Sequence, residues 1–214
     1  MSETILTLHE REGVHNTAAT LAAARQRAEA LGIRQFVVAT TTGQTALTCA
    51  ETMPEITTIV AVMMHAVDEE IHVNRPSGRM RAPHPETVKK AQDKGVKVYR
   101  GTHSLMGSVN TALQEKFGGW SPEALISAAY MSISTGTKVG VECTLMAADA
   151  GYLDMSQPVI ALGGWRGGAD TAMVIRPAYS HSFFDLRILE FIAMPRTDGG
   201  ASTAREKGDL TSHP

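Results

Sequence analysis

A run of hydroxyl-bearing residues surrounds one glycine where an apolar segment gives way to a helical pattern. The segment reads VVATTTGQTA, residues 37–46. A glycine lets the backbone turn tightly and approach a ligand, and the first amides of a helix have no intrahelical acceptor. Amides and hydroxyls together suit a phosphate dianion. The spacing predicts a phosphate site, and the alternative is that Thr42 only caps the helix. The predicted site comprises Thr40, Thr41, Thr42, Gly43 and Thr45.

A second candidate is the glycine-rich segment GGWRGGADT, residues 163–171. Four glycines in six residues expose backbone amides, and Arg166 is a partner for phosphate. Asp170 and Thr171 either orient this loop or accept a hydroxyl of the ligand, and Trp165 either stacks on a ring or covers the core edge. The competing interpretation is a flexible hairpin loop. We predict ligand contacts from Gly163, Gly164, Arg166, Asp170 and Thr171.

Three ionisable residues stand near expected strand ends or inside apolar sequence. His65 and His103 each follow a predicted strand, where side chains of a parallel sheet face the ligand. Glu142 lies in the otherwise apolar VECTLMAADAG, where Asp149 would share its helical face. A buried carboxylate is a candidate acid or base, whereas an exposed one is ordinary. We assign Glu142 and His103 as candidate catalytic residues, His65 and His103 as ligand contacts, and no metal ligands.

Composition narrows the function classes. The chain has 214 residues, 43% of them apolar and 20% charged, with a net charge of −2. No basic block stands out, so neither nucleic acid nor a membrane is expected as a partner. The N-terminus does not resemble a signal peptide, and Cys49 and Cys143 are predicted to be reduced thiols. We therefore expect a cytoplasmic protein that binds a small phosphorylated molecule, with a homo-oligomer left open.

The apolar periodicity alternates between strands and helices, which predicts a parallel sheet with helices on both faces. The last three strands are joined too tightly for crossovers, so some must be antiparallel. One domain is expected over 1–196, with a polar loop or lid at 65–83 and a mobile tail at 197–214. Strands are predicted at Thr4–Leu8, Phe36–Ala39, Thr57–Met64, Val96–Tyr99, Val159–Leu162, Ala172–Ile175 and Leu189–Ala193. Helices are predicted from Thr17 to Gly32, at Thr45–Glu51, at Pro85–Lys94, around Leu105–Leu113, from Pro122 to about Ser134 with a stop at Gly136, and from there to Gly151.

The threonine-glycine turn is similar to the phosphate-binding loop in the C-terminal domain of pyruvate kinases. VECTLMAADAG, GGWRGGADTAMVIRPA, HSLMGS and His65 resemble segments of a family of stand-alone proteins that look like this domain without the kinase barrel. The resemblance extends from about residue 4 to residue 196. It implies a three-layer α/β/α fold with a mixed, mostly parallel sheet, and binding of flavin mononucleotide (FMN). It implies no specific reaction.

Three functions follow as hypotheses. The first is a protein that binds a phosphorylated ligand, FMN, across the strand ends. The second is a flavin-dependent oxidoreductase in which Glu142 or a histidine donates a proton. The third is a non-catalytic sensor of a phosphorylated metabolite, like the regulatory domain of pyruvate kinase.

Overall fold

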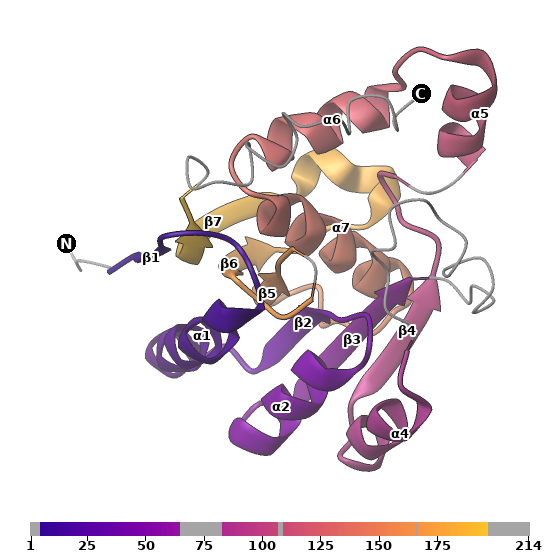
Figure 1. Cartoon of the computed structure of the whole chain (residues 1–214). Helices are drawn as coiled ribbons and strands as arrows, with labels where there is room; N and C mark the ends of the chain where they lie inside the picture. Colours follow the sequence, from indigo (N-terminus) through magenta and orange to yellow (C-terminus); the bar gives the residue numbers. More distant parts are fainter. Residues whose placement is uncertain (1–4, 65–82, 107–108, 166, 197–214) are drawn as a thin grey trace.

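The computed structural model describes residues 5–64, 83–106, 109–165 and 167–196 (Figure 1). The predicted lid at 65–83, apart from its last residue, and the predicted tail at 197–214 lie outside the described residues. Among the helices that are described, none combines the length and apolar character needed to cross a membrane.

A seven-stranded mixed sheet forms the middle layer, in the order β1-β7-β6-β5-β2-β3-β4. Only β6 runs against its neighbours, and the other described pairings are parallel. This confirms the expected α/β class and the antiparallel pairing among the closing strands. The strands are β1 (Thr7–His9), β2 (Gln35–Ala39), β3 (Thr58–Met64), β4 (Lys97–Gly101), β5 (Val159–Gly163), β6 (Thr171–Arg176) and β7 (Arg187–Pro195).

Helices cover both faces of the sheet (Figure 1). Three of them, α1 (Thr17–Leu31), α2 (Gln44–Thr52) and α4 (Pro85–Asp93), pack on one face, and α7 (Thr135–Asp149) crosses the other. α6 packs on the outer side of α7. The remaining elements are α5 (Val109–Phe117), α6 (Pro122–Met131) and the short 3-10 helices η1 (Val14–Asn16) and η2 (Ser180–Asp185).

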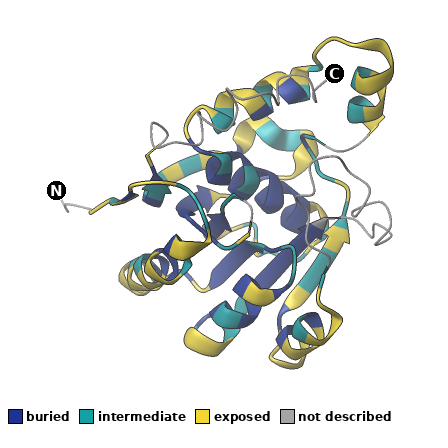
Figure 2. Ribbon diagram, viewed as in Figure 1, coloured by how far each residue is buried: buried dark blue, intermediate teal, exposed yellow. Residues whose placement is uncertain are grey.

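Side chains alternate between two apolar cores along the central strands. Phe36 and Val38 of β2 belong to the core beneath α1, α2 and α4, whereas Val37 between them belongs to the core beneath α7. Both cores are buried against the sheet (Figure 2). Burial on both faces explains why the strands of the sheet centre read as continuous apolar runs.

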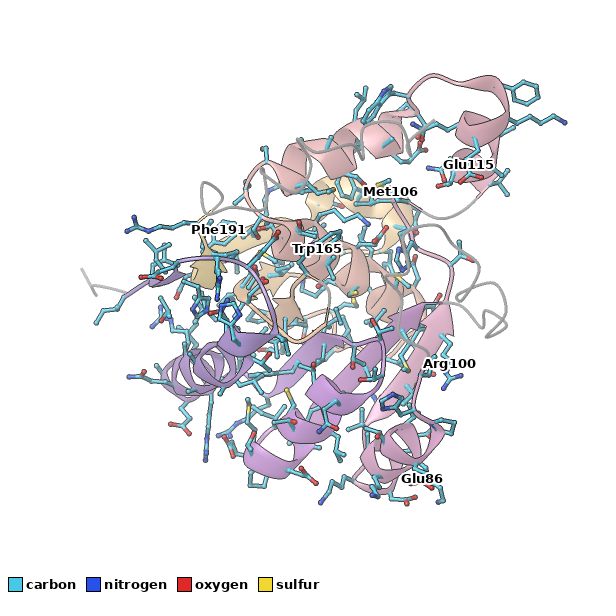
Figure 3. The ribbon with its side chains drawn as sticks, in the orientation of Figure 1. Glu86, Arg100, Met106, Glu115, Trp165 and Phe191 are labelled. Carbon is cyan, nitrogen blue, oxygen red and sulfur yellow. The ribbon has the colours of Figure 1, made fainter. Side chains whose placement is uncertain are left out.

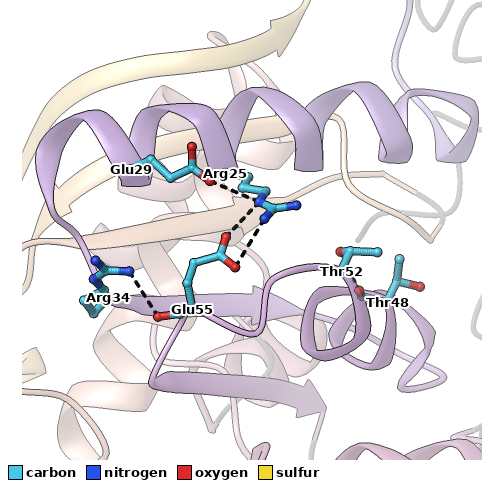
Figure 4. Close-up of polar contacts among 6 residues, drawn as sticks. All are labelled: Arg25, Glu29, Arg34, Thr48, Thr52 and Glu55. Atoms are coloured by element: carbon cyan, nitrogen blue, oxygen red, sulfur yellow. Dashed lines mark hydrogen bonds and ion pairs between the residues drawn. The ribbon is translucent and has the colours of Figure 1, made fainter.

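Local signals fix most helix ends. Gly32 ends α1 with φ 68°, a left-handed conformation that favours glycine. Ser121 caps α6 by accepting from the amide of Ala124. Arg25 in the middle of α1 pairs with Glu29 of the same helix and with Glu55, which follows α2 (Figure 4).

Two predicted boundaries are wrong. α6 ends at Met131, and Gly136 does not stop it but lies in the first turn of α7. A Cβ on Gly136 would come within 2.2 Å of Thr171 Oγ1, so glycine is needed there for close packing. Leu105 lies in a bend and does not begin a helix, and α5 is first described from Val109. The amide of Leu105 donates to the Glu142 side chain.

Candidate functional site at the carboxyl edge of the sheet

The carboxyl ends of β2, β3, β4 and β5 meet at one edge of the sheet, because these four strands are parallel. The segments that follow β2 and β5 contain most of the predicted site residues, and α2 and α7 begin at this edge. Ligands of open α/β sheets bind at this kind of edge. Figure 3 shows the side chains around it.

The threonine-glycine turn joins the end of β2 to α2. The amide of Thr40 continues the sheet by donating to Val62 O at 3.0 Å. Thr40 Oγ1 then accepts the amide of Gly43 at 3.1 Å, and Thr42 Oγ1 accepts the amide of Gln44 at 3.3 Å. Both hydroxyls therefore fold the turn, and each keeps its own proton to donate. Thr41 and Thr42 are half-buried at the edge, whereas Thr40 and Thr45 are buried.

Two helix amides of this turn remain for a ligand. The first intrahelical bond of α2 runs from Leu47 N to Gly43 O. Over the ranges that the structure describes, the amides of Thr45 and Ala46 donate no hydrogen bond. Unpaired amides at a helix start favour an anion through their partial positive charge.

Packing against α4 also accounts for a glycine at position 43. Its φ is 93°, and a Cβ there would lie 3.0 Å from Val88 Cγ2 and 3.3 Å from Val88 N. The glycine therefore lets the turn approach α4, and Thr42 O accepts the amide of His84 just before that helix. A side chain at Gly43 would press on α4 in the presence or absence of a ligand.

The glycine-rich loop is fastened to the start of the chain through Asp170. Asp170 Oδ2 accepts the amides of Gly13 at 2.9 Å and Trp165 at 3.4 Å, and Oδ1 accepts the hydroxyl of Thr171 at 2.9 Å. Burial raises the pKa of Asp170, and the Gly13 amide opposes that shift. Asp170 thus orients the loop, the first of its two predicted roles, and its contact with a ligand stays a prediction.

Close packing accounts for the glycines of β5 and its loop. A Cβ on Gly163 would lie 2.2 Å from Gly136 O of α7, and one on Gly164 would lie 2.8 Å from Gly168 O. Buried hydroxyls bond to one another at the first turn of α7, because Ser134 Oγ accepts the amide of Thr137 and bonds Thr171 Oγ1. The hydroxyl of Thr171, a predicted ligand contact, is therefore engaged within the protein.

Three ionisable side chains meet where α7 faces the segment after β4. Glu142 is 2% exposed and its Oε1 accepts the amides of Leu105 at 2.8 Å and Met106 at 2.9 Å. Glu142 Oε2 lies 2.5 Å from Lys138 Nζ and 3.3 Å from His103 Nδ1. We call Lys138, Glu142 and His103 the ionic cluster.

Tyr99 of β4 is half-buried on the same face of the sheet as α7. Its ring packs in the core beneath α7, and its hydroxyl reaches so close to Gly101 that a Cβ there would lie 2.2 Å from it. The end of β4 thus presents a phenol and an imidazole on the side of α7.

The structure brings some predicted residues together and separates others. Glu142 and His103 are in contact, as assigned, but Asp149 is exposed and accepts the amide of Ser180 at 2.9 Å, so it does not accompany Glu142. His65 and Arg166 lie outside the described residues. Lys138 was missed, although its position four residues before Glu142 is the spacing of a helical ion pair.

The comparison with known families concerns most of the chain. The model of the family described as "Pyruvate kinase, alpha/beta domain" matches residues 18–175 of the 214. The chain belongs to this family. The matched range includes the threonine-glycine turn, the ionic cluster and the glycine-rich loop, so the pyruvate kinase alpha/beta domain contains the whole candidate site. The match confirms the resemblance of the fold, and it does not identify a ligand or a reaction.

The donors of this domain suit a phosphate better than a metal ion. Within the described ranges, no group of three or more His, Cys, Asp or Glu residues is arranged to hold a metal. The threonine-glycine turn instead offers amides and hydroxyl protons, which bind anionic oxygen. It therefore fits the phosphate of FMN or of another phosphorylated molecule.

Proposed function

We propose that this pyruvate kinase alpha/beta domain binds a phosphorylated ligand, FMN, at the carboxyl edge of its sheet. The observation that carries the proposal is the turn at Thr40–Thr45, where no described hydrogen bond occupies the amides of Thr45 and Ala46 and the hydroxyls of Thr40 and Thr42 accept amides, so their own protons can be donated. The rest of the ligand lies across the strand ends, between His103 and the glycine-rich loop. We include His65 as a ligand contact because it follows β3 and resembles the family segment, and Arg166 because it lies in the glycine-rich loop.

The hydrogen-bond donors of the turn and the size of the ligand allow an estimate of the binding affinity. Each hydrogen bond to a charged phosphate oxygen contributes about 1.5–3 kcal/mol, and the helix dipole adds about 0.3–1 kcal/mol. A ligand with roughly 31 heavy atoms at about −0.3 kcal/mol per atom reaches about −9 kcal/mol, which is sub-micromolar binding. FMN would supply its isoalloxazine ring as the redox-active group, and the turn would bind only its phosphate.

The first test is the visible absorption spectrum of the freshly purified protein, followed by titration with FMN. We expect flavin absorption or sub-micromolar binding. Thr42→Val keeps the shape of the side chain but removes the hydroxyl that would donate to the phosphate and that accepts the amide of Gln44, so Kd should rise about 10- to 150-fold. Thr52→Val is the matched control, because Thr52 lies at the far end of α2 and donates to Thr48 O at 2.7 Å (Figure 4). Equal affinity of the two variants would place the phosphate elsewhere.

Family membership favours a second candidate, a non-catalytic sensor of a phosphorylated metabolite. It uses the same turn but not a flavin. A hexose bisphosphate would then raise the unfolding temperature while FMN would not, and the purified protein would be colourless. Thr42→Val should abolish that shift, and a shift that survives the substitution would argue against this candidate.

A further inference from the structure

An exposed apolar surface lies on α5, on α6 and on the segment that joins them. Figure 2 shows exposed residues along both of these helices. Six large apolar side chains, each at least 36% exposed, come from this continuous stretch of the chain: Val109, Leu113, Phe117, Trp120, Leu125 and Ile133. We call these six residues the α5–α6 surface. Large apolar patches that face solvent mark sites of interaction.

The helix α5 has no buried residue of its own. Its apolar residues Val109, Leu113 and Phe117 recur every four positions, so they line one face of the helix. Isolated helices shorter than about 12–15 residues are marginal in water, and most of the stability of a helix comes from packing of its apolar face. None of the residues that the structure describes buries this face. The nine-residue helix α5 therefore needs a packing partner beyond them.

The outer face of α6 is exposed as well, and it carries no charge. Leu125, Ala128, Ala129 and Ser132 are exposed and follow the i, i+3, i+4, i+7 spacing of a single helix face. No Asp, Glu, Lys or Arg occurs within residues 124–137. A surface helix normally carries charged residues on the side away from the core. Both sides of α6 are therefore suited to packing, one against α7 and the other against a partner.

We propose that the α5–α6 surface binds the same surface of a second copy of this chain, so that the protein is a two-fold symmetric homodimer. A two-fold interface pairs a patch with itself, so the patch must be complementary to itself in charge. An uncharged surface meets this condition, because no like charges face each other across the axis. The small side chains Ala128 and Ala129 also let two α6 helices approach closely. A partner with a charged surface would instead bury unpaired charges here.

The exposed area is close to what a stable dimer needs. A standard interface buries about 800 Å² on each partner, and about 65% of a homodimer interface is apolar, which amounts to about 520 Å². A whole aromatic side chain buries about 150–250 Å², so Phe117, at 72% exposed, and Trp120, at 66%, offer roughly 200–350 Å². The four aliphatic residues supply the remainder. Glu115 and Lys116 of α5, which are exposed and opposite in charge, suit the polar rim of such an interface.

This dimer leaves the phosphate site open. α6 packs on α7, whereas the threonine-glycine turn begins α2 on the opposite face of the sheet (Figure 1). Dimer formation is therefore independent of FMN binding. Residues 197–214, which lie outside the described residues, are a poor alternative cover for the surface, because Leu210 is their one large apolar residue and five of the eighteen are charged.

The first experiment measures the mass of the full chain by light scattering after gel filtration, at about 1–100 μM. We expect twice the 22.9 kDa of one chain. Leu125→Glu should give a folded monomer, because its carboxylate would face the apolar surface of the partner. Two-fold symmetry repeats the substitution, so a tenfold loss per copy raises the dimer dissociation constant about 100-fold. The matched control is Leu31→Glu, since Leu31 is 45% exposed at the end of α1 on the other face of the sheet, and it should remain a dimer.

The second experiment uses tryptophan emission to show which surface is buried. In Trp165→Phe, Trp120 is the one remaining tryptophan, and its emission should move to longer wavelength when dilution separates the two copies. Adding Leu125→Glu should give the longer wavelength at every concentration. A monomeric wild type at about 100 μM, a Leu125→Glu variant that stays dimeric, or a Trp120 emission indifferent to dilution overturns the inference.

Titration with FMN keeps this result separate from the proposed function. Leu125→Glu and Leu31→Glu should bind FMN with the Kd of the wild type, because both positions are remote from the threonine-glycine turn. Absence of FMN binding by a dimeric wild type would overturn the proposed function and leave the dimer standing.

Discussion

The pair formed by Lys138 and Glu142 gives a quantitative prediction. Glu142→Gln keeps the shape of the side chain and one acceptor oxygen, but it leaves the ammonium of Lys138 buried without a counter-charge. Breaking a buried pair in this way costs about 3–5 kcal/mol. For a chain of this length about 1 kcal/mol corresponds to 2–4 °C, so the unfolding midpoint should fall by roughly 6–20 °C.

A double-mutant cycle measures the interaction free energy between Lys138 and Glu142 separately from the effect of each substitution alone. Lys138→Met leaves Glu142 with two amides and His103, so it should cost less, about 1.5–3 kcal/mol. The double variant removes both charges and should be more stable than the sum of the two losses by about 2 kcal/mol. Urea unfolding at pH 7, followed by circular dichroism, provides all four free energies of unfolding.

The control uses another ion pair of the same helical spacing. Lys89 and Asp93 lie 3.2 Å apart on α4, and their side chains are 75% and 62% exposed. Lys89→Met should leave the free energy of unfolding unchanged within error, because exposed pairs contribute little. If the Lys138 and Glu142 losses add in the double variant to within about 0.5 kcal/mol, the pair does not act as a unit and the argument for the ionic cluster fails.

Three further predictions test other parts of the site. Gly43→Ala should lose about 1–3 kcal/mol, because φ is 93° and the new Cβ meets Val88 at 3.0 Å; the loss should appear in thermal unfolding without any ligand. Burial raises the pKa of Cys49 to about 12 and raises that of Cys143 as well, so neither thiol should react with a thiol-specific disulfide reagent at pH 8 until the protein unfolds. Burial raises the pKa of Asp170 above its ordinary value of 3.8. The stabilisation linked to its protonated form is therefore fully present below pH 3.8 and is lost as the pH rises through the raised pKa. Asn does not ionise, so unfolding midpoints measured from about pH 4 upward should fall less with pH for Asp170→Asn than for the wild type.

The alternation of elements was predictable because its causes are local. Continuous apolar runs mark strands buried on both faces, and residues such as Gly32 and Ser121 end or begin helices through their own backbone and hydroxyl chemistry. The threonine-glycine turn was recognisable for the same reason. Its hydroxyls, amides and glycine are neighbours in the chain, so the sequence presents them together.

The incorrect predictions concern positions whose local structure depends on residues distant in the sequence. Gly136 looks like a helix stop, but it lies inside α7 because Thr171 occupies the space that a side chain would need. Leu105 fits a helical pattern, but it lies in a bend whose amide donates to Glu142, 37 positions away in the sequence. From the sequence Lys138 is expected to be an exposed charge on a helix, and only the fold shows that this part of α7 is buried.

Stability does not account for the ionic cluster. One neutral acceptor at position 142 would satisfy the amides of Leu105 and Met106, and apolar residues in place of a buried ion pair are often neutral or stabilising. The neighbouring residues in the core beneath α7, such as Val141 and Leu145, are apolar. The charges are confined to the side of α7 that faces the end of β4, where His103 reaches the edge of the sheet. Their position at the carboxyl edge of the sheet is expected if the charge of Glu142 orients the imidazole beside it.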